Sequence, residues 1–189
     1  MIRLFGLSGS LRAASSSAAL LRALAGRLDG RATLKIGEIG NLPHYNADTD
    51  GGPAVAALIK AIKEADGVVF VTPEYNYSVP GVLKNAIDWA SRPAYQSVFK
   101  GKPAFVVSVS GGALGGVRAQ GHLKYILNGM LAEVFTAQEI VVPHANAKVE
   151  NGVFTDEPTL EFAFASLGAF VEQIGRATGS ERNIRAESS

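Results

Sequence analysis

The sequence predicts a doubly wound α/β fold, in which helices cover both faces of a parallel β-sheet. Short apolar runs alternate along the chain with longer segments whose apolar residues recur at helical spacing. The run at residues 68–71 is continuously apolar and rich in β-branched residues, which is typical of a strand covered on both faces. Each strand–helix–strand crossover must lay its helix over a sheet face, so the alternation favours two helical layers around one sheet.

Five strands are expected, each a short apolar run. They comprise residues 2–7, 32–36, 68–71, 104–109 and 139–142. The first run ends at a Ser-Gly-Ser loop that begins at Ser8, and the second run is the weakest of the five. Five runs of this length are enough for one open sheet.

Helices are expected after these strands, because apolar residues recur three and four positions apart. The second helix also has Pro53, which is favoured in a first turn. The apolar residues that define the five helices are Leu20, Leu21, Leu24 and Leu28; Val55, Leu58, Ile59 and Ile62; Leu83, Ala86, Ile87 and Ala90; Leu123, Ile126, Leu127, Met130 and Val134; and Leu160, Phe164, Leu167, Phe170, Val171 and Ile174. We therefore expect one domain over residues 1–179 and a polar, frayed tail over residues 180–189.

The composition limits the class of protein. The chain has 189 residues, 47% hydrophobic and 19% charged, as in a globular domain that needs no disulfide or metal to hold it. A net charge of +1 without a basic run argues against nucleic acid as a partner. The absence of cysteine excludes thiolate zinc sites and thiol catalysis. The N-terminal apolar run is too short for a signal peptide, and no run of about 18 apolar residues occurs, so we expect a cytoplasmic protein without a membrane partner.

Ligands of doubly wound sheets bind beyond the carboxyl ends of the strands, so the loops after Leu7, Thr72 and Val109 form the candidate site. The first loop reads GSLRAASSS from Gly9 and opens a helix. Its small residues leave backbone amides free for an anion at the helix N-terminus, and Arg12 adds a charge that binds phosphate. The alternative is that its serines only cap the helix. The P-loop and dinucleotide-binding patterns are absent.

The loop after the third strand reads PEYNYSVPG from Pro73. Its two prolines fix the backbone on either side of two tyrosines, a glutamate and an asparagine. Such a stiff loop of polar and aromatic groups suits recognition of a flat heterocycle. The alternative for Tyr75 and Tyr77 is packing against a subunit or the helix below.

Three motifs together resemble the NAD(P)H-dependent FMN reductase family, which includes quinone and chromate reductases. They are GSLRAASSS, PEYNYSVPGVLKNAIDWASRP and GGALGGVRAQGHL, and each begins in one of the candidate loops. The resemblance runs from about Arg3 to the fifth strand. It implies a flavodoxin-like sheet of strand order 2-1-3-4-5, noncovalently bound FMN, NAD(P)H as cosubstrate, and a homodimer or homotetramer.

The resemblance also implies which residues hold the cofactor. The FMN phosphate is assigned to the hydroxyl-rich loop, with contacts from Ser10, Arg12, Ser15, Ser16 and Ser17. The isoalloxazine and ribityl chain are assigned to the loop after the third strand, with contacts from Pro73, Glu74, Tyr75 and Asn76. The pyrimidine end is assigned to Ser110 and Gly111. Arg118 and His122 would meet a neighbouring subunit or cover the flavin, with a solvated helix face as the default for Arg118. No metal and no protein nucleophile are expected.

The expected activity is hydride transfer from NAD(P)H through FMN to quinones or other small oxidants, such as free flavin, chromate, azo or nitro compounds, by a ping-pong mechanism. A flavodoxin-type electron carrier is the second hypothesis, although a net charge of +1 offers no strongly charged docking face. A serine hydrolase is the third, but the nucleophile-elbow motif is absent and the three histidines are scattered. The sequence leaves the choice between NADH and NADPH open.

Self-association is expected through the helix at residues 81–91. Other apolar residues of this helix already supply its face toward the sheet, so Val82 and Trp89 have no evident core to enter. A partner subunit would cover them.

Overall fold

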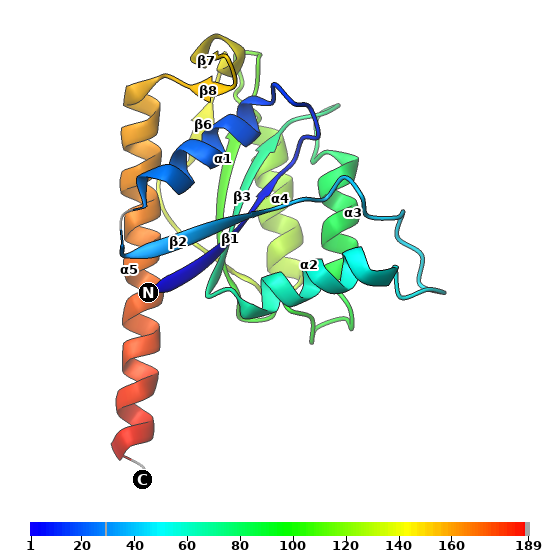
Figure 1. The fold of residues 1–189 in the computed structure, drawn as a ribbon, viewed down its shortest axis with the longest axis vertical. Helices are drawn as coiled ribbons and strands as arrows, with labels where there is room; N and C mark the ends of the chain where they lie inside the picture. The colour runs from blue at the N-terminus through cyan, green and yellow to red at the C-terminus, as the bar shows by residue number, and fades with distance from the viewer. Residues whose placement is uncertain (29, 188–189) are drawn as a thin grey trace.

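The computed structural model describes residues 1–28 and 30–187 and shows a parallel sheet between two layers of helices (Figure 1). The strand order is β2-β1-β3-β4, and two short strands, β5 and β6, both lie beside β4. Every pair of neighbouring strands in this sheet is parallel. This order confirms the predicted flavodoxin-like fold.

The sheet and the helices alternate along the chain as the sequence predicts. The strands of the sheet are β1 (Ile2–Ser8), β2 (Ala32–Gly37), β3 (Gly67–Pro73), β4 (Pro103–Val109), β5 (Glu133–Val134) and β6 (Ile140–Val142). The helices are α1 (Ser16–Arg27), α2 (Gly52–Glu64), α3 (Gly81–Ala90), α4 (Val117–Gly129) and α5 (Glu157–Glu187). A short 3-10 helix, η1 (Ala145–Lys148), leads into an antiparallel hairpin of β7 (Val149–Glu150) and β8 (Val153–Phe154).

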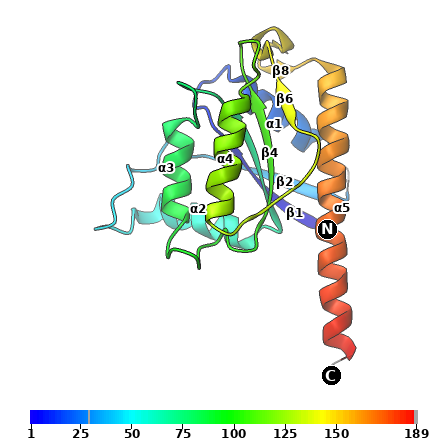
Figure 2. The same cartoon turned by 180° about the vertical axis from the view of Figure 1, so that it is seen from behind.

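Two apolar cores hold the layers together, one on each face of the sheet. Helices α1 and α5 cover one face (Figure 2), where Leu20 and Phe170 are fully buried. Helices α2, α3 and α4 cover the other face, where Phe70 and Leu123 are fully buried. The continuous apolar run predicted for the third strand is thus explained, because alternate β3 side chains enter opposite cores.

The predicted fifth strand, residues 139–142, corresponds to β6, and β5 is an additional short strand that lies outside the predicted ones. Strand β5 pairs with the start of β4, and β6 pairs with its end. The expectation that Val134 belongs to the preceding helix is wrong. Helix α4 ends at Gly129, and Leu131 turns the chain with a φ of 63°, so the Ala132 amide donates to the Leu127 carbonyl at 3.1 Å. A residue in the left-handed region ends a helix, and Val134 therefore continues as a strand.

The expectation that Trp89 has no core to enter is also wrong. Its side chain is only 4% exposed. The loop before α2 covers it: Trp89 Nε1 donates to the Pro43 carbonyl at 2.8 Å, and the Tyr45 ring meets the indole edge-on at 5.0 Å. Val82 is partly buried against the α2–α4 core. The chain itself therefore supplies the cover that we expected from a partner subunit.

The last helix is longer than expected. Helix α5 continues through Glu187, whereas the sequence predicts a frayed tail from residue 180. Residues 188 and 189 of that predicted tail lie outside the described residues. The division of the chain into a domain at 1–179 and a tail at 180–189 stays a prediction. Among the helices of the described chain, none combines the length and hydropathy needed to cross a membrane.

Candidate functional site

Three loops meet at the carboxyl ends of β1, β3 and β4, as the sequence predicts. The register pairs Ser8 with Val71 and Pro73 with Val109, so the three strands end side by side. A pocket of about 110 Å³ lies between the loops, lined by Ser10, Arg12, Ser15, Ser16, Pro73, Glu74, Tyr75, Val109, Ser110, Gly111 and Asn146. All of the predicted contact residues except Ser17 and Asn76 line this pocket.

The hydroxyl-rich loop after β1 is organised by a chain of serine hydroxyls. Ser15 is the N-cap of α1, and its Oγ accepts from the Ala18 amide at 3.3 Å. The buried Ser17 Oγ lies 2.7 Å from Ser15 Oγ and 3.0 Å from Ser8 Oγ. Ser17 therefore links the end of β1 to the start of α1 and holds the loop between them. Ser15 caps the helix, as the alternative interpretation of the serines expects. Ser16, the first residue of α1, lines the pocket, and its amide has no partner within the helix.

Arg12 is the free charge of this loop. Its side chain is exposed, and its guanidinium has no hydrogen-bond or ion-pair partner within residues 1–28 and 30–187. A guanidinium beside a helix N-terminus favours an anion, because the charge and the helix dipole have the same sign. The arrangement fits a phosphate group.

The loops after β1 and β3 approach each other closely. A Cβ atom at Gly9 would lie 2.8 Å from both Thr72 Oγ1 and Pro73 Cδ, so only glycine fits there. Further out, the Ser10 hydroxyl lies 3.2 Å from the Tyr75 hydroxyl. The phosphate-type loop and the aromatic loop thus form two walls of one pocket.

The aromatic loop contains a tight hairpin turn. The Tyr75 amide donates to the Ser78 carbonyl and the Ser78 amide donates to the Tyr75 carbonyl, both at 3.1 Å. The two central residues, Asn76 and Tyr77, have φ values of 48° and 69°. Positive φ at both central positions is typical of a type I′ turn, and it is strained for tyrosine. Asn76 is at the tip of this turn, which explains why it does not line the pocket.

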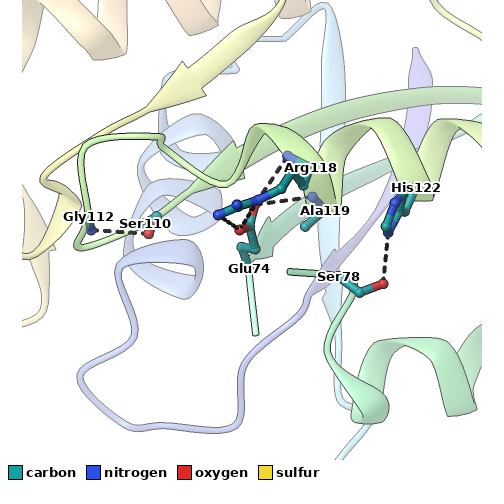
Figure 3. Close-up of polar contacts among 7 residues, drawn as sticks. All are labelled: Glu74, Ser78, Ser110, Gly112, Arg118, Ala119 and His122. Carbon is teal, nitrogen blue, oxygen red and sulfur yellow. Dashed lines mark hydrogen bonds and ion pairs between the residues drawn. The ribbon is translucent and has the colours of Figure 1, made fainter. Parts of the chain in front are cut away.

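Glu74 and Arg118 form an ion pair beside the pocket (Figure 3). Arg118 Nε donates to Glu74 Oε1 at 2.7 Å, while the amides of Arg118 and Ala119 donate to Oε2 at 3.1 and 3.3 Å. The Arg118 guanidinium also lies over the Tyr77 ring, 4.0 Å from its centroid. Burial raises the pKa of Glu74, but the hydrogen bonds from Arg118 and Ala119 outweigh it, and the pKa lies below its ordinary value. The Arg118 side chain is 39% exposed, as the default interpretation of a solvated residue expects, but it is also paired with Glu74 and Tyr77.

His122, one turn further along α4, contacts the same hairpin. Its Nδ1 lies 3.0 Å from Ser78 Oγ (Figure 3). The hairpin is thus attached to α4 through both Arg118 and His122.

Two residues that line the pocket, Val109 and Asn146, are not among the predicted contacts, and Asn146 is the polar one. It belongs to η1, which is bound to the loop after β4: the Ala145 amide donates to the Ser110 carbonyl at 2.8 Å, and the His144 amide donates to the Gly112 carbonyl at 3.1 Å. A Cβ atom at Gly111 would lie 2.7 Å from Asn146 Nδ2, so the amide lies directly against this glycine. In the described part of the chain, the Asn146 amide has no hydrogen-bond partner. The rule that selected the other loops would have found it, because Asn146 follows the end of β6.

A flavodoxin-like sheet whose phosphate-type, aromatic and glycine-rich loops surround one pocket fits the class of FMN-binding proteins. The comparisons with known proteins agree. The sequence model of the NADPH-dependent FMN reductase family matches residues 2–147. The chain therefore belongs to the NADPH-dependent FMN reductase family, and it is an enzyme with FMN as cofactor and NAD(P)H as cosubstrate.

Relatives that are named as FMN or quinone reductases align with most of the chain. An NAD(P)H-dependent FMN reductase of Pseudomonas aeruginosa is 38% identical over 182 residues, which span 94% of this chain and 98% of the relative. A quinone reductase of Escherichia coli K12 is 46% identical over 144 residues, 73% of this chain and 76% of the relative. The structure of FerB, a flavoenzyme NAD(P)H:(acceptor) oxidoreductase from Paracoccus denitrificans, superposes with a TM-score of 0.83 at 38% identity, covering 93% of this chain and 98% of FerB.

Proposed function

We propose that this protein transfers hydride from NAD(P)H, through bound FMN, to quinones and other small oxidants. The observation that carries the proposal is Arg12, which lies just before α1 and has no side-chain partner among the described residues, in a pocket that also contains Tyr75, Ser110 and Gly111. One end of this pocket has the charge for a phosphate, and the other has an exposed aromatic ring for a flat heterocycle.

The residues fit FMN in three groups. Ser10, Arg12 and the first turn of α1 would bind the phosphate, with Ser15 and Ser17 holding that turn in place. Pro73 and Tyr75 would contact the ring and ribityl chain, together with Asn76 and the backbone of Glu74 in the same loop. Ser110, Gly111 and Asn146 would close the remaining side. A pocket of about 110 Å³ is smaller than a typical cofactor site of roughly 300–1,000 Å³, so the ring would extend over the open rim by the tyrosines.

The flavin supplies the redox chemistry, and the protein supplies binding and orientation. Quinones are favoured as acceptors because the Escherichia coli relative is named for them. Free flavin, chromate, azo and nitro compounds are further candidates. The sequence has no second nucleotide-binding fingerprint beside these loops, so NAD(P)H and the oxidant would use the same opening in turn.

The direct test compares FMN with riboflavin, which lacks the phosphate. We expect the purified protein to bind FMN and to bind riboflavin more weakly, because only FMN engages Arg12 and the α1 N-terminus. The FMN-loaded protein should oxidise NADPH when 1,4-benzoquinone is added. Equal affinity for the two flavins would contradict the phosphate assignment, and absence of quinone-dependent NADPH oxidation would contradict the activity.

A homodimer or homotetramer is part of the proposal, on the strength of the resemblance alone. Trp89 no longer supports it, because the chain covers this side chain itself. A monomeric mass by light scattering at micromolar concentration would contradict the oligomer. A cytoplasmic location likewise stays a prediction from the sequence.

A further inference from the structure

The Glu74 carboxylate contacts helix α4. Both of its oxygens accept hydrogen bonds, and every donor belongs to Arg118 or Ala119. The side chain is only 8% exposed. Glu74 lines the pocket, but in the described structure its polar atoms are committed to the first turn of α4.

Helix α4 has no capping side chain of its own. The residue before it is Gly116, whose φ is 83°, and no side chain at that position can accept from the first-turn amides. These amides are donors that a helix cannot satisfy internally, and a negative charge near them is favoured by the helix dipole. Glu74, 44 residues earlier in the sequence, therefore takes the place of the N-cap.

Arg118 transmits this constraint to the hairpin. Its guanidinium binds the Glu74 carboxylate and at the same time lies over the ring of Tyr77, which is 69% exposed. Tyr77 has a positive φ, and a bulky residue keeps such a conformation only when its surroundings hold it there. The contact with Arg118, and the contact of Ser78 with His122, provide that support.

We propose that Glu74 and Arg118 form a positioning pair that sets the shape of the substrate opening. Glu74 holds the start of α4, Arg118 holds Tyr77, and the hairpin between Tyr75 and Ser78 is thereby fixed relative to the pocket. This role rests on the proposed function, because the opening matters only if NAD(P)H and the oxidant pass through it. The Glu74 side chain then acts on catalysis through the hairpin, without contacting the flavin.

The test is Glu74→Gln, which keeps the shape of the side chain but removes its charge. We expect the KM values for NADPH and for 1,4-benzoquinone to rise together by about tenfold. Both ligands use the same opening, and the hairpin that borders it is no longer held in position. The dissociation constant for FMN should stay within about threefold of wild type. The Tm should fall by a few degrees, because a neutral amide is a weaker substitute cap for α4 than the carboxylate. Glu139→Gln is the matched control, because it removes another carboxylate bound to α4, through Lys124, away from the hairpin.

A second pair of variants tests the same role without disturbing the cap of α4. Tyr77→Leu removes the ring under Arg118 and should raise both KM values, whereas Tyr77→Phe keeps a ring and should restore them. These variants decide the question even if Glu74→Gln does not fold.

Three results would overturn the positioning role. One is an altered FMN affinity or flavin reduction potential in Glu74→Gln with unchanged KM values, which would make Glu74 a direct flavin contact. Another is a lower Tm and lower FMN content with unchanged KM values in the folded fraction, which would make its role purely structural. The third is unchanged KM values in Tyr77→Leu. If the wild-type protein binds no FMN, the proposed function itself is wrong. The absorption spectrum of the wild-type protein detects this outcome independently of the variants.

Discussion

The hydroxyl groups of Ser10 and Tyr75 lie 3.2 Å apart, and they join the loop after β1 to the loop after β3. Each loop comes from a different strand, and the contact spans 65 positions of the sequence. Ser10 belongs to the charged end of the pocket and Tyr75 to its aromatic end, so this contact lies where the two ends meet. An extended ligand such as FMN would contact both ends of the pocket. A substitution at one end should therefore weaken only the contacts made there, and each end can be tested separately.

Arg12 tests the charged end. Arg12→Ala should weaken FMN binding by about 1.5–3 kcal/mol, the range for a hydrogen bond to a charged group. Riboflavin binding should change little, because it has no phosphate for Arg12 to contact. Titration of both flavins, followed by fluorescence, measures the difference. Arg22→Ala is the control, since Arg22 lies on the same helix and donates to the Gly152 carbonyl away from the pocket. Equal losses for both flavins would show that Arg12 acts on the fold of the loop.

Asn146 tests the side of the pocket that the sequence analysis missed. Asn146→Ala should weaken FMN and riboflavin by a similar amount, about 0.5–1.5 kcal/mol, as expected for one neutral hydrogen bond. The two flavins share the ring and ribityl chain, which are the parts assigned to this side. The exposed Asn128 on α4 provides the control substitution, Asn128→Ala. An unchanged affinity for both flavins in Asn146→Ala would remove Asn146 from the proposed site.

Asp156 gives a prediction on stability and pH. Hydrogen bonds from Lys148, at 2.7 Å, and from Thr159 lower the pKa of Asp156 below its ordinary value. A lowered pKa in the folded state contributes stability that is present above the unfolded-state value, about 3.9, and is lost as the pH falls through the folded value. Asp156→Asn should therefore be less stable than wild type at pH 7, by roughly 0.5–1 kcal/mol.

The measurement is urea unfolding of wild type and Asp156→Asn at neutral and at acidic pH. The difference in the free energy of unfolding should shrink once the pH is below the pKa of the folded protein, because the carboxyl is then neutral in both states. Asp48→Asn, at an exposed position in the loop before α2, is the control. A difference that is the same at both pH values would assign the effect to packing and not to charge.

The shared opening predicts ping-pong kinetics. If NAD(P)H and the oxidant occupy the same place in turn, reduction and reoxidation are separate half-reactions. Steady-state rates with NADPH and a benzoquinone varied together should then give parallel double-reciprocal lines. Anaerobic mixing with NADPH alone should bleach the flavin. Intersecting lines, or bleaching only after quinone is added, would mean that both substrates bind together.

Helix and strand periodicity determined most of this fold from the sequence. The spacing of Leu20, Leu21 and Leu24, and the unbroken apolar run at residues 68–71, are local patterns, and each is satisfied by burial on one or both sides of its own element. The rule that ligands bind at the carboxyl ends of parallel strands then located the loops with Arg12, Tyr75 and Gly111.

Only the tertiary structure decided the features that depend on distant partners. Trp89 is buried because the loop with Pro43 and Tyr45 folds back over it, and the spacing of α3 contains no information about that loop. Glu74 is bound to α4 because Gly116 leaves that helix without a cap, a need that appears only when the two elements lie side by side. Periodicity reports which face of an element is buried, whereas the partner of a polar side chain depends on how separate elements come together.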